Sequence, residues 1–263
     1  MSHLFDPDST DGRNRRFSGE KDHLGLELQR RLMTDMLQPA FAKSLLDIGC
    51  GTGASLVPFL NKGIDLTGID PSVDMLNAAR RNLGHRVDLH KGYPEDLPFD
   101  DNSFNYTVIF LTLEFCAEPF RAAEEACRVT RDRIFIGIIN KFSLYAAQCR
   151  AEERLKSNLY TRPRFFTIGE IRRMLFYFLG RVPLNWETVF QFPWLPGALI
   201  QRVESTGMFR SSPFGGFAGI TADPVPSFRA LPLALKCRIH QPAPQGEQAA
   251  SCAGDYQNEK IEN

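Results

Sequence analysis

The sequence predicts an α/β protein in which helices cover both faces of a doubly wound parallel β-sheet. Three observations support this fold class. Strand-like and helix-like segments alternate between residues 44 and 140, a glycine-rich turn follows the first predicted strand, and several strands are continuously apolar. Strands that are apolar on both faces need helices on both sides, and parallel neighbours need helical crossovers.

The elements of the first half follow from residue periodicity and from the residues at their ends. Residues 20–38 place leucines and methionines at helical spacing, and this helix ends before a proline. A proline and a serine near the start and a glycine at the end mark a helix at 71–84. A helix over 52–63 would be closed by Gly63 and kinked by Pro58. The predicted strands are 44–49, 64–70, 86–92, 105–111 and 133–140, and a further helix is 118–130.

The pattern is looser after residue 141. We predict helices at 143–157 and 167–180, strands at 187–192 and 216–223, and one short helix at most between 194 and 208. From residue 241 the apolar periodicity is lost, which predicts a disordered tail at 241–263. We therefore expect a single domain over 1–240, made of a lead-in and helix at 1–43 and two halves at 44–140 and 141–240.

The overall composition excludes some classes of protein. The chain has 263 residues with 31 basic and 31 acidic side chains, so it lacks the basic excess of a general nucleic-acid binder. The hydrophobic fraction of 43% argues against a disordered chain. The neutral total conceals a split, with a net charge of −5 over 1–140 and +8 over 141–240. Phenylalanine is uneven too, since 10 of the 21 lie between Phe165 and Phe228.

Neither a signal peptide nor a membrane span is expected. The first twenty residues are polar and charged, and no uninterrupted apolar window approaches the length of about 18 residues that a span requires. The six cysteines form no CxxC pair and have no closely spaced histidine pair beside them. This usage predicts reduced thiols in the cytoplasm and no structural metal.

The most informative segment is the run LLDIGCGTGAS at residues 45–55. Gly49, Gly51 and Gly53 follow a strand, where backbone N–H groups can approach a ligand closely. Asp70 ends the next strand, 21 residues after Gly49, where a carboxylate can accept hydrogen bonds from ribose hydroxyls. This spacing fits both a nicotinamide dinucleotide and S-adenosylmethionine.

Asp47 favours the second cofactor. It lies two residues before Gly49, where its charge would repel a pyrophosphate at a cost of roughly 1 kcal/mol or more. S-adenosylmethionine has no phosphate, and its sulfonium and α-ammonium groups are both cationic. A carboxylate close to the glycine loop would attract these groups.

Three motifs resemble those of class I S-adenosylmethionine-dependent methyltransferases. LLDIGCGTG resembles motif I, GIDPSVDML at 68–76 is similar to the second motif, and GYPEDLPFDDNSFNYTVIF at 92–110 is similar to a segment of the methyltransferase type 11 branch. That branch includes ubiquinone, menaquinone and other small-molecule methyltransferases. The resemblance covers about residues 40–140. It implies a Rossmann-like sheet of seven strands in the order 3-2-1-4-5-7-6, with strand 7 antiparallel and formed near 216–223.

The resemblance also implies roles for individual residues. Gly49, Cys50 and Gly51, with Gly53 in the same loop, would line the methionine moiety. Asp47 would support this loop or reach the ammonium through water, and Asp70 would bind the ribose hydroxyls. The residues expected beside the adenine are Pro71, Met75, Glu95, Asp96 and Leu97, and those expected below the transferring methyl group are Leu111 and Thr112.

Two positions depart from the family pattern. The usual Asp-Ala pair that reads adenine is Tyr93-Pro94 here, and a proline has no N–H to donate. Tyr93 or Asp96 would therefore have to supply the adenine contact. The aspartate that usually follows Ser-Phe is Asn105, which is expected to change only a contact at the start of a strand.

The chemistry needs few catalytic groups, because in-line methyl transfer gains much from proximity and orientation. A general base is needed only when the methyl acceptor carries a proton at the working pH. The candidate catalytic residues are Glu114 just past the fourth strand, Asn140 at the end of the fifth, and Tyr93. Further candidates from flanking segments are Tyr145, Tyr160, His3 and His23.

The predicted function is methyl transfer from S-adenosylmethionine to a small anionic or lipophilic acceptor. The first half would bind the cofactor, and the basic and Phe-rich second half would cover the acceptor, although a solvated helical face and plain packing explain the same residues. Two other functions stay open, a nicotinamide-dependent oxidoreductase and a non-catalytic S-adenosylmethionine-binding module. We expect a small-molecule partner and no nucleic acid; the sequence does not indicate the oligomeric state.

Overall fold

The computed structural model describes residues 20–155, 163–190, 195 and 197–224. All of these described residues belong to one unit. The predicted domain boundary at 240 and the predicted tail at 241–263 lie outside the described residues, so the domain limits stay a prediction.

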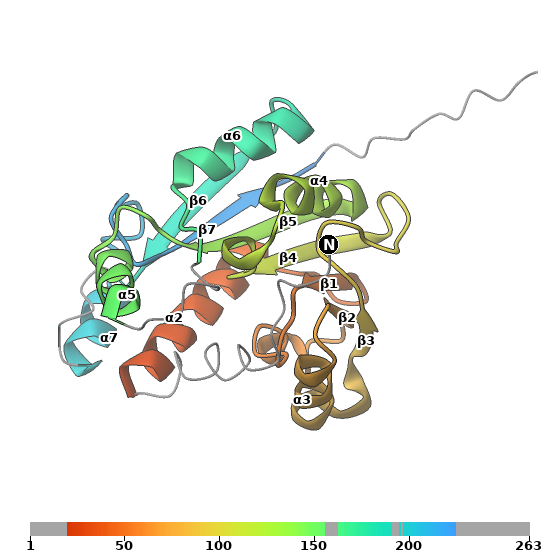
Figure 1. Ribbon diagram of the computed structural model, residues 1–263, viewed down its shortest axis with the longest axis horizontal. Helices are drawn as coiled ribbons and strands as arrows, with labels where there is room; N and C mark the ends of the chain where they lie inside the picture. Colours follow the sequence, from red (N-terminus) through yellow and green to blue (C-terminus); the bar gives the residue numbers. More distant parts are fainter. Residues whose placement is uncertain (1–19, 156–162, 191–194, 196, 225–263) are drawn as a thin grey trace, which may run out of the picture. The chain divides into compact units, whose positions relative to one another are not determined.

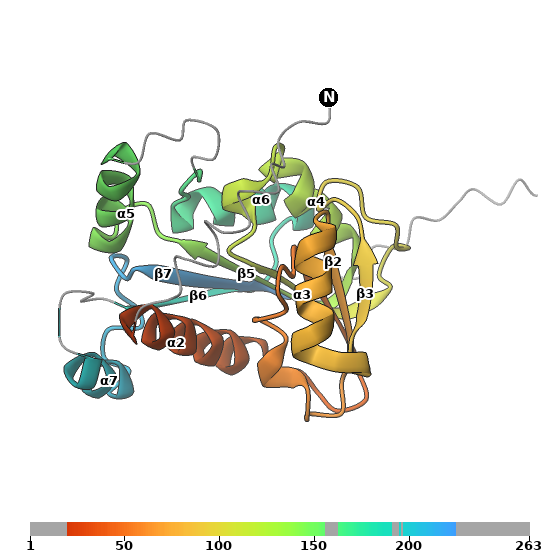
Figure 2. The ribbon, with the colours of Figure 1, turned by 60° about the horizontal axis from the view of Figure 1, so that its bottom comes forward.

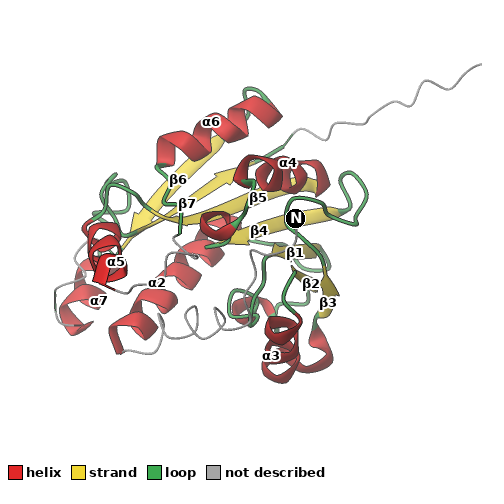
Figure 3. Cartoon of the chain, in the orientation of Figure 1, coloured by secondary structure: helices red, strands yellow, loops and turns green. Residues whose placement is uncertain are grey.

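Helices and strands alternate along the chain as the sequence predicts (Figures 1 and 3). The α-helices are α2 (Glu20–Leu37), α3 (Val73–Leu83), α4 (Pro119–Val129), α5 (Leu144–Leu155), α6 (Ile168–Leu179) and α7 (Gly197–Ser205). The strands are β1 (Ser44–Ile48), β2 (Asp65–Asp70), β3 (Asp88–Lys91), β4 (Phe104–Phe110), β5 (Thr130–Ile139), β6 (Leu184–Val189) and β7 (Phe217–Ala222). The 3₁₀ helices are η1 (Val57–Phe59), η2 (Gly84–Arg86) and η3 (Leu113–Phe115). None of the helices in the described part of the chain is long and apolar enough to cross a membrane.

The described strands form one seven-stranded sheet of order β3-β2-β1-β4-β5-β7-β6, which confirms the predicted fold class and strand order. The strands from β3 to β5 are all parallel to their neighbours, whereas β7 runs antiparallel to both β5 and β6. The carboxyl ends of β1, β2, β4 and β5 therefore meet at one end of the sheet. In open α/β sheets this is the end where ligands bind.

Helices cover both faces of the sheet. Figure 2 shows α2 on one side of the strands and α4 and α6 on the other. Alternation along β5 accounts for the two layers, because successive side chains of a strand point to opposite faces. Ile134, Ile136 and Ile138 belong to the core cluster that includes α4 and α6, whereas Phe135 belongs to the cluster that includes α2 and α3.

Two helices begin and end at the residues that the sequence indicates. The hydroxyl group of Ser72 accepts a hydrogen bond from a backbone N–H in the first turn of α3, and Gly84 ends this helix with a φ of +65°. Thr167 and Glu170 form a reciprocal capping box at the start of α6, and Gly180 ends it with a φ of +70°. Both glycines adopt the left-handed region that other residues enter only at a cost.

The helix predicted over 52–63 is wrong. This segment forms turns and the 3₁₀ helix η1 in place of an α-helix. Pro58 cannot donate the backbone hydrogen bond that an α-helix requires. The segment instead forms bonds between residues three apart, such as the N–H of Phe59 with the carbonyl of Leu56 at 3.0 Å.

Of the last two strands, β7 agrees with its predicted bounds and β6 is displaced toward the N-terminus. β7 occupies the predicted segment 216–223, but β6 begins three residues before the predicted 187–192 and ends at Val189. Phe190 has a φ of +64°, which takes the backbone out of the extended conformation directly after β6. Residues 191–192 lie outside the described residues.

Candidate functional site

The glycine loop turns away from the end of β1 with three glycines in the left-handed region. The φ angles of Gly49, Gly51 and Gly53 are +75°, +53° and +80°. A Cβ atom on Gly49 would lie 2.2 Å from the Cγ2 atom of Thr112, so a larger residue cannot pack there without a shift. A Cβ atom on Gly51 would meet no atom within 4 Å. The backbone at residue 51 therefore borders open space, into which a ligand can approach.

Asp70 fixes this loop from the end of β2. Its carboxylate is 1% exposed and accepts hydrogen bonds from the N–H of Gly51 and from the N–H of Ser72, both at 2.9 Å. The first bond holds the glycine loop and the second holds the start of α3. Asp70 thus joins the two motifs that the sequence singles out, although its side chain does not line the cavity described below.

Asp47 is a fully buried carboxyl group at the end of β1. Its Oδ2 atom accepts a hydrogen bond from the hydroxyl of Ser55, and its Oδ1 atom has no hydrogen-bond partner among the described residues. Burial raises the pKa of Asp47 to about 7, the hydrogen bond from Ser55 opposes this rise, and the negative charge of Asp70 adds to it. The group is thus poised between its neutral and charged forms near physiological pH.

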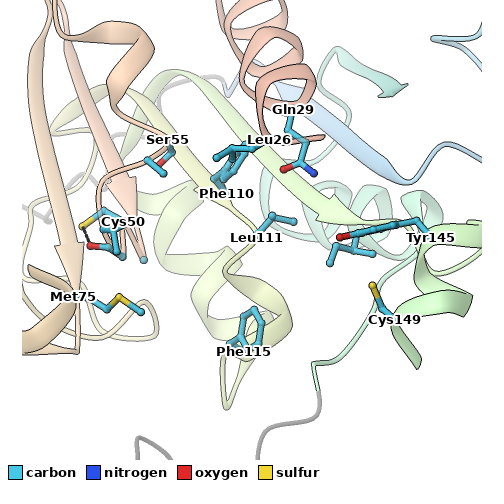
Figure 4. A pocket seen from close by; sticks show the side chains of 15 residues that line it. Leu26, Gln29, Cys50, Ser55, Met75, Phe110, Leu111, Phe115, Tyr145 and Cys149 are labelled. Atoms are coloured by element: carbon cyan, nitrogen blue, oxygen red, sulfur yellow. Dashed lines mark hydrogen bonds between the residues drawn. The ribbon is translucent and has the colours of Figure 1, made fainter. Parts of the chain in front are cut away.

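A cavity opens between the glycine loop and helices α2 and α5 (Figure 4). Its walls come from the loop after β1, the start of α3, the ends of β4 and β5, η3, α2 and α5. The lining residues are Leu26, Gln29, Gly49, Cys50, Gly51, Thr52, Ala54, Ser55, Met75, Phe110, Leu111, Phe115, Ile139, Tyr145 and Cys149. None of these described side chains carries a formal charge at neutral pH.

The cavity has two unlike parts. The loop residues and Met75 line one side with backbone groups and small side chains, whereas Phe110, Leu111 and Phe115 make an apolar wall on the other side (Figure 4). Leu111 directs its side chain here from a backbone φ of +54°, a conformation that leucine adopts rarely and at a cost. We call this apolar part the chamber; it is bounded by Leu26, Gln29, Phe110, Leu111, Phe115, Ile139, Tyr145 and Cys149.

Cys50 lies on the loop side of the cavity but is not an activated nucleophile. Its thiol is 5% exposed, and burial, together with the charges of Asp47 and Asp70, raises its pKa. A thiol that stays protonated is a weak nucleophile. Among the described residues, no group of His, Cys, Asp and Glu side chains could hold a metal ion.

Several of the residues predicted to bind the cofactor stand outside the cavity lining. Gly49, Cys50, Gly51, Met75 and Leu111 line the cavity. The other residues that were predicted to bind the cofactor do not line the cavity: Asp47, Gly53, Asp70, Pro71, Glu95, Asp96, Leu97 and Thr112. Of these, Thr112 packs directly on the loop, since its hydroxyl donates to the carbonyl of Gly49 at 3.3 Å.

The segment that departs from the family pattern is held in place by its neighbours. Glu95 accepts a hydrogen bond from the N–H of Ala117 at 3.0 Å, and Leu97 donates its N–H to Glu125 at 2.9 Å. Tyr93 is 56% exposed and its carbonyl accepts the N–H of Asp96 at 3.2 Å. The segment thus forms a fixed turn whose tyrosine ring remains exposed.

The candidate catalytic residues Glu114 and Asn140 are buried and bind backbone groups. Glu114 accepts a hydrogen bond from the N–H of Ile139 at 2.8 Å. The side-chain amide of Asn140 donates to the carbonyls of Pro213 at 2.7 Å and Gly215 at 3.1 Å. Neither side chain, nor that of Tyr93, lines the cavity.

Tyr145 does line the chamber, as one of the flanking candidates, and Figure 4 shows its hydroxyl end directed toward Leu111. Tyr160, His3 and the side chain of His23 lie outside the described residues. The lining residues that the sequence did not indicate are Leu26, Gln29, Thr52, Ala54, Ser55, Phe110, Phe115, Ile139 and Cys149. The helical spacing of 20–38 could have shown that Leu26 and Gln29 share a face, but not what that face covers.

A mostly parallel sheet whose glycine loop meets a cavity at the carboxyl ends of the strands is typical of Rossmann-like proteins that bind a nucleoside cofactor. Comparison with known proteins narrows this class. A family model described as "Methyltransferase domain" matches residues 46–135. An uncharacterized protein of Methanocaldococcus jannaschii is 32% identical over 182 residues, which cover 68% of this chain and 82% of that protein.

Two further similar proteins have names that state a methyltransferase activity. The demethylmenaquinone methyltransferase of Paenarthrobacter aurescens is 35% identical over 102 residues, which cover 39% of this chain but only 40% of that enzyme. The solved structure of a SAM-dependent methyltransferase from Thermotoga maritima has a TM-score of 0.61 and 23% identity, and the match covers 84% of this chain and 98% of that one. At this identity the structural likeness shows the fold.

The chain belongs to the class I S-adenosylmethionine-dependent methyltransferases. This membership agrees with the motifs in the sequence and favours S-adenosylmethionine over the nicotinamide cofactor that the glycine spacing left open.

Proposed function

We propose that this protein transfers a methyl group from S-adenosylmethionine to a neutral, lipophilic small molecule. One observation carries the proposal: a single cavity joins the glycine loop to an apolar chamber. The sequence left anionic and lipophilic acceptors open. The chamber favours the lipophilic class, because no described lining residue offers a positive charge to an anion.

Two features of the loop support the cofactor's position. The open space beside Gly51 can receive the methionine moiety, and the Oδ1 atom of Asp47 lacks a partner that an ammonium group, directly or through water, would supply. We further propose that Asp70 and Met75 face the ribose and the adenine. The remaining residues proposed for the adenine are Pro71, Glu95, Asp96 and Leu97, and Leu111 and Thr112 are proposed to lie below the methyl group.

Methyl transfer requires little of the protein beyond holding the methyl donor and the acceptor in line. S-adenosylmethionine, when bound, supplies an electrophilic methyl group on a sulfonium, which an acceptor can take by in-line displacement. Leu111 and Phe115 would exclude water from the line of transfer and hold the acceptor at reacting distance. Glu114 and Asn140 are proposed to act through the backbone, since Glu114 holds the carboxyl end of β5 and Asn140 joins the residue after β5 to the segment before β7.

Calorimetry tests the cofactor assignment. S-adenosylhomocysteine, which has the same nucleoside and amino-acid groups, is expected to bind in the micromolar range, whereas NADH is expected to give no heat of binding. Tight binding of NADH with no signal from S-adenosylhomocysteine would overturn the assignment.

A turnover assay separates the enzyme from a non-catalytic binding module. The protein is incubated with S-adenosylmethionine and a panel of neutral lipophilic alcohols, phenols and amines, each paired with a carboxylated analogue, and the release of S-adenosylhomocysteine is measured. We expect turnover with neutral members of the panel. Turnover confined to the carboxylated members would contradict the lipophilic class, and binding without any turnover would favour the non-catalytic module.

The cellular location stays a prediction. Among the cysteines in the described residues, Cys50 and Cys127 are buried free thiols. Reduced thiols support the proposed cytoplasmic location. Small-molecule acceptors remain the proposed partners.

A further inference from the structure

Gln29 is a buried polar side chain in the wall of the largely apolar chamber, and its amide oxygen lacks a hydrogen-bond partner among the described residues. It lies on α2, is 4% exposed, and lines the chamber beside Leu26. Its Oε1 atom is buried and has no hydrogen-bond partner among the described residues. Most buried polar groups in native proteins are hydrogen-bonded, so a buried amide oxygen without a partner needs an explanation.

Gln29 lies on the face of α2 that is otherwise apolar and packs in the core. Leu26, Gln29, Met33 and Met36 follow one another at helical spacing along the buried face of α2. Met33 and Met36 are 0% and 6% exposed and pack in the core cluster beneath the sheet. The glutamine replaces an apolar residue at the point where the helix leaves the core and begins to cover the cavity.

The surroundings specify the chemistry that would satisfy Gln29. Figure 4 shows its amide group directed into the cavity, while Tyr145 enters from the other side with its hydroxyl toward Leu111. The rest of the chamber wall consists of Leu, Phe, Ile and Cys side chains. An amide oxygen accepts hydrogen bonds, so its missing partner is an O–H or N–H group.

We propose that Gln29 selects the methyl acceptor: its Oε1 atom accepts a hydrogen bond from a hydroxyl or N–H group of an otherwise apolar molecule in the chamber. This inference rests on the proposed function and adds the acceptor's polar group to it. A hydrocarbon of the same shape would leave the amide oxygen buried and unpaired, which is why sites of this kind discriminate strongly against analogues without the donor.

Matched pairs of small aromatic molecules test the proposal. Phenol with toluene, and 2-naphthol with 2-methylnaphthalene, differ by a hydroxyl in place of a methyl group of similar size. Binding is measured by calorimetry to the protein saturated with S-adenosylhomocysteine. The wild type is expected to bind the hydroxyl member of at least one pair about tenfold or more tightly than the methyl member.

The variant Gln29→Met keeps the length of the side chain and removes the amide. The preference for the hydroxyl member should disappear, while the affinity for S-adenosylhomocysteine should stay within about twofold. Leu26→Met, a change of shape on the same wall without loss of a polar group, should keep the preference. Gln29→Met should also raise the Tm of the ligand-free protein by about 2–4 °C, because an unpaired buried amide is removed.

Each contrary result overturns the proposal in a distinct way. Equal affinities within every pair in the wild type, or no binding of any pair, refute the role of Gln29 without any variant. A preference that survives in Gln29→Met assigns the hydrogen bond to another residue. If Gln29→Met instead weakens S-adenosylhomocysteine about tenfold and leaves the preference intact, the donor is the cofactor's ammonium and the acceptor assignment fails. Failure of S-adenosylhomocysteine to bind the wild type would instead refute the proposed function.

Discussion

The buried carboxyl group of Asp47 should make the stability of the ligand-free protein fall as the pH rises. The pKa of this group is 3.8 in an unfolded chain and is raised to about 7 in the fold. Between these two values the folded state holds a proton that the unfolded state has lost, so each rise in pH favours unfolding. The contribution of the neutral carboxyl is complete below pH 3.8 and is lost once the pH has passed about 7.

The size of the effect follows from the shift of the pKa. A rise of the pKa from 3.8 to about 7, at 1.36 kcal/mol for each pH unit, amounts to roughly 4 kcal/mol over the whole range. Between pH 5 and pH 8 the loss is about 2.5 kcal/mol. That is a sizeable part of the 5–15 kcal/mol by which domains are typically stable, so an experiment can resolve it.

The variant Asp47→Asn isolates this group. An asparagine imitates the neutral carboxyl at every pH and can still accept the hydrogen bond from the hydroxyl of Ser55. In urea unfolding of the ligand-free protein, the variant should be more stable than the wild type by about 1.5 kcal/mol at pH 5 and by about 4 kcal/mol at pH 8, so the difference should widen by about 2.5 kcal/mol. Asp65→Asn, an exposed carboxylate on the adjoining strand β2, serves as the control and should follow the wild type.

The pH dependence of ligand affinity is a second test of the protonation of Asp47. If the ammonium of the cofactor lies near Asp47, S-adenosylhomocysteine must bind the charged form, so its affinity should fall by up to about tenfold per pH unit below pH 7. Asp47→Asn should bind more weakly at pH 8 and lose this pH dependence. Parallel stability curves for the wild type and Asp47→Asn would refute the buried titration, and an unchanged affinity profile would refute the contact with the ammonium.

Further substitutions test the loop and its supports. Gly49→Ala should lower the Tm strongly because its Cβ would lie 2.2 Å from Thr112, and adding Thr112→Ala should restore part of the loss in the same thermal scans. Gly51→Ala meets open space but keeps the strain of a φ of +53°, so calorimetry should show at least tenfold weaker binding of S-adenosylhomocysteine with a smaller fall in Tm than that of Gly49→Ala. Asp70→Asn should weaken S-adenosylhomocysteine at least tenfold, because one of its two backbone hydrogen bonds would face an amide N–H. Arg128→Met should cost about 2–3 kcal/mol in urea unfolding, since this arginine binds the carboxylate of Glu125 on α4 and, in the segment before β4, the carboxylate of Asp101 and two carbonyl groups. A cost below about 0.5 kcal/mol would contradict this role.

The arrangement of the glycine loop against Asp70 could be predicted from the sequence because its determinants are local. Gly49 and Gly51 lie two residues apart in the loop that follows β1, and Asp70 ends β2. Parallel pairing of β1 with β2 brings these residues together, so the order of elements is enough to place them. The helix expected over 52–63 failed for a local reason as well, because a single proline turned it into a 3₁₀ turn.

The chamber could not be predicted in the same way, since its walls come from α2, the end of β4 and α5, which are far apart in the chain. Apolar residues such as Phe110 look alike in a sequence whether they fill a core or line a cavity. Asn140 shows the opposite problem, because a polar residue at a strand end resembles a catalytic group but here binds two backbone carbonyls. Burial and hydrogen bonding separate these cases. Asn140 has its partners within the protein, whereas Gln29 has an oxygen without one, and only the second residue faces the cavity.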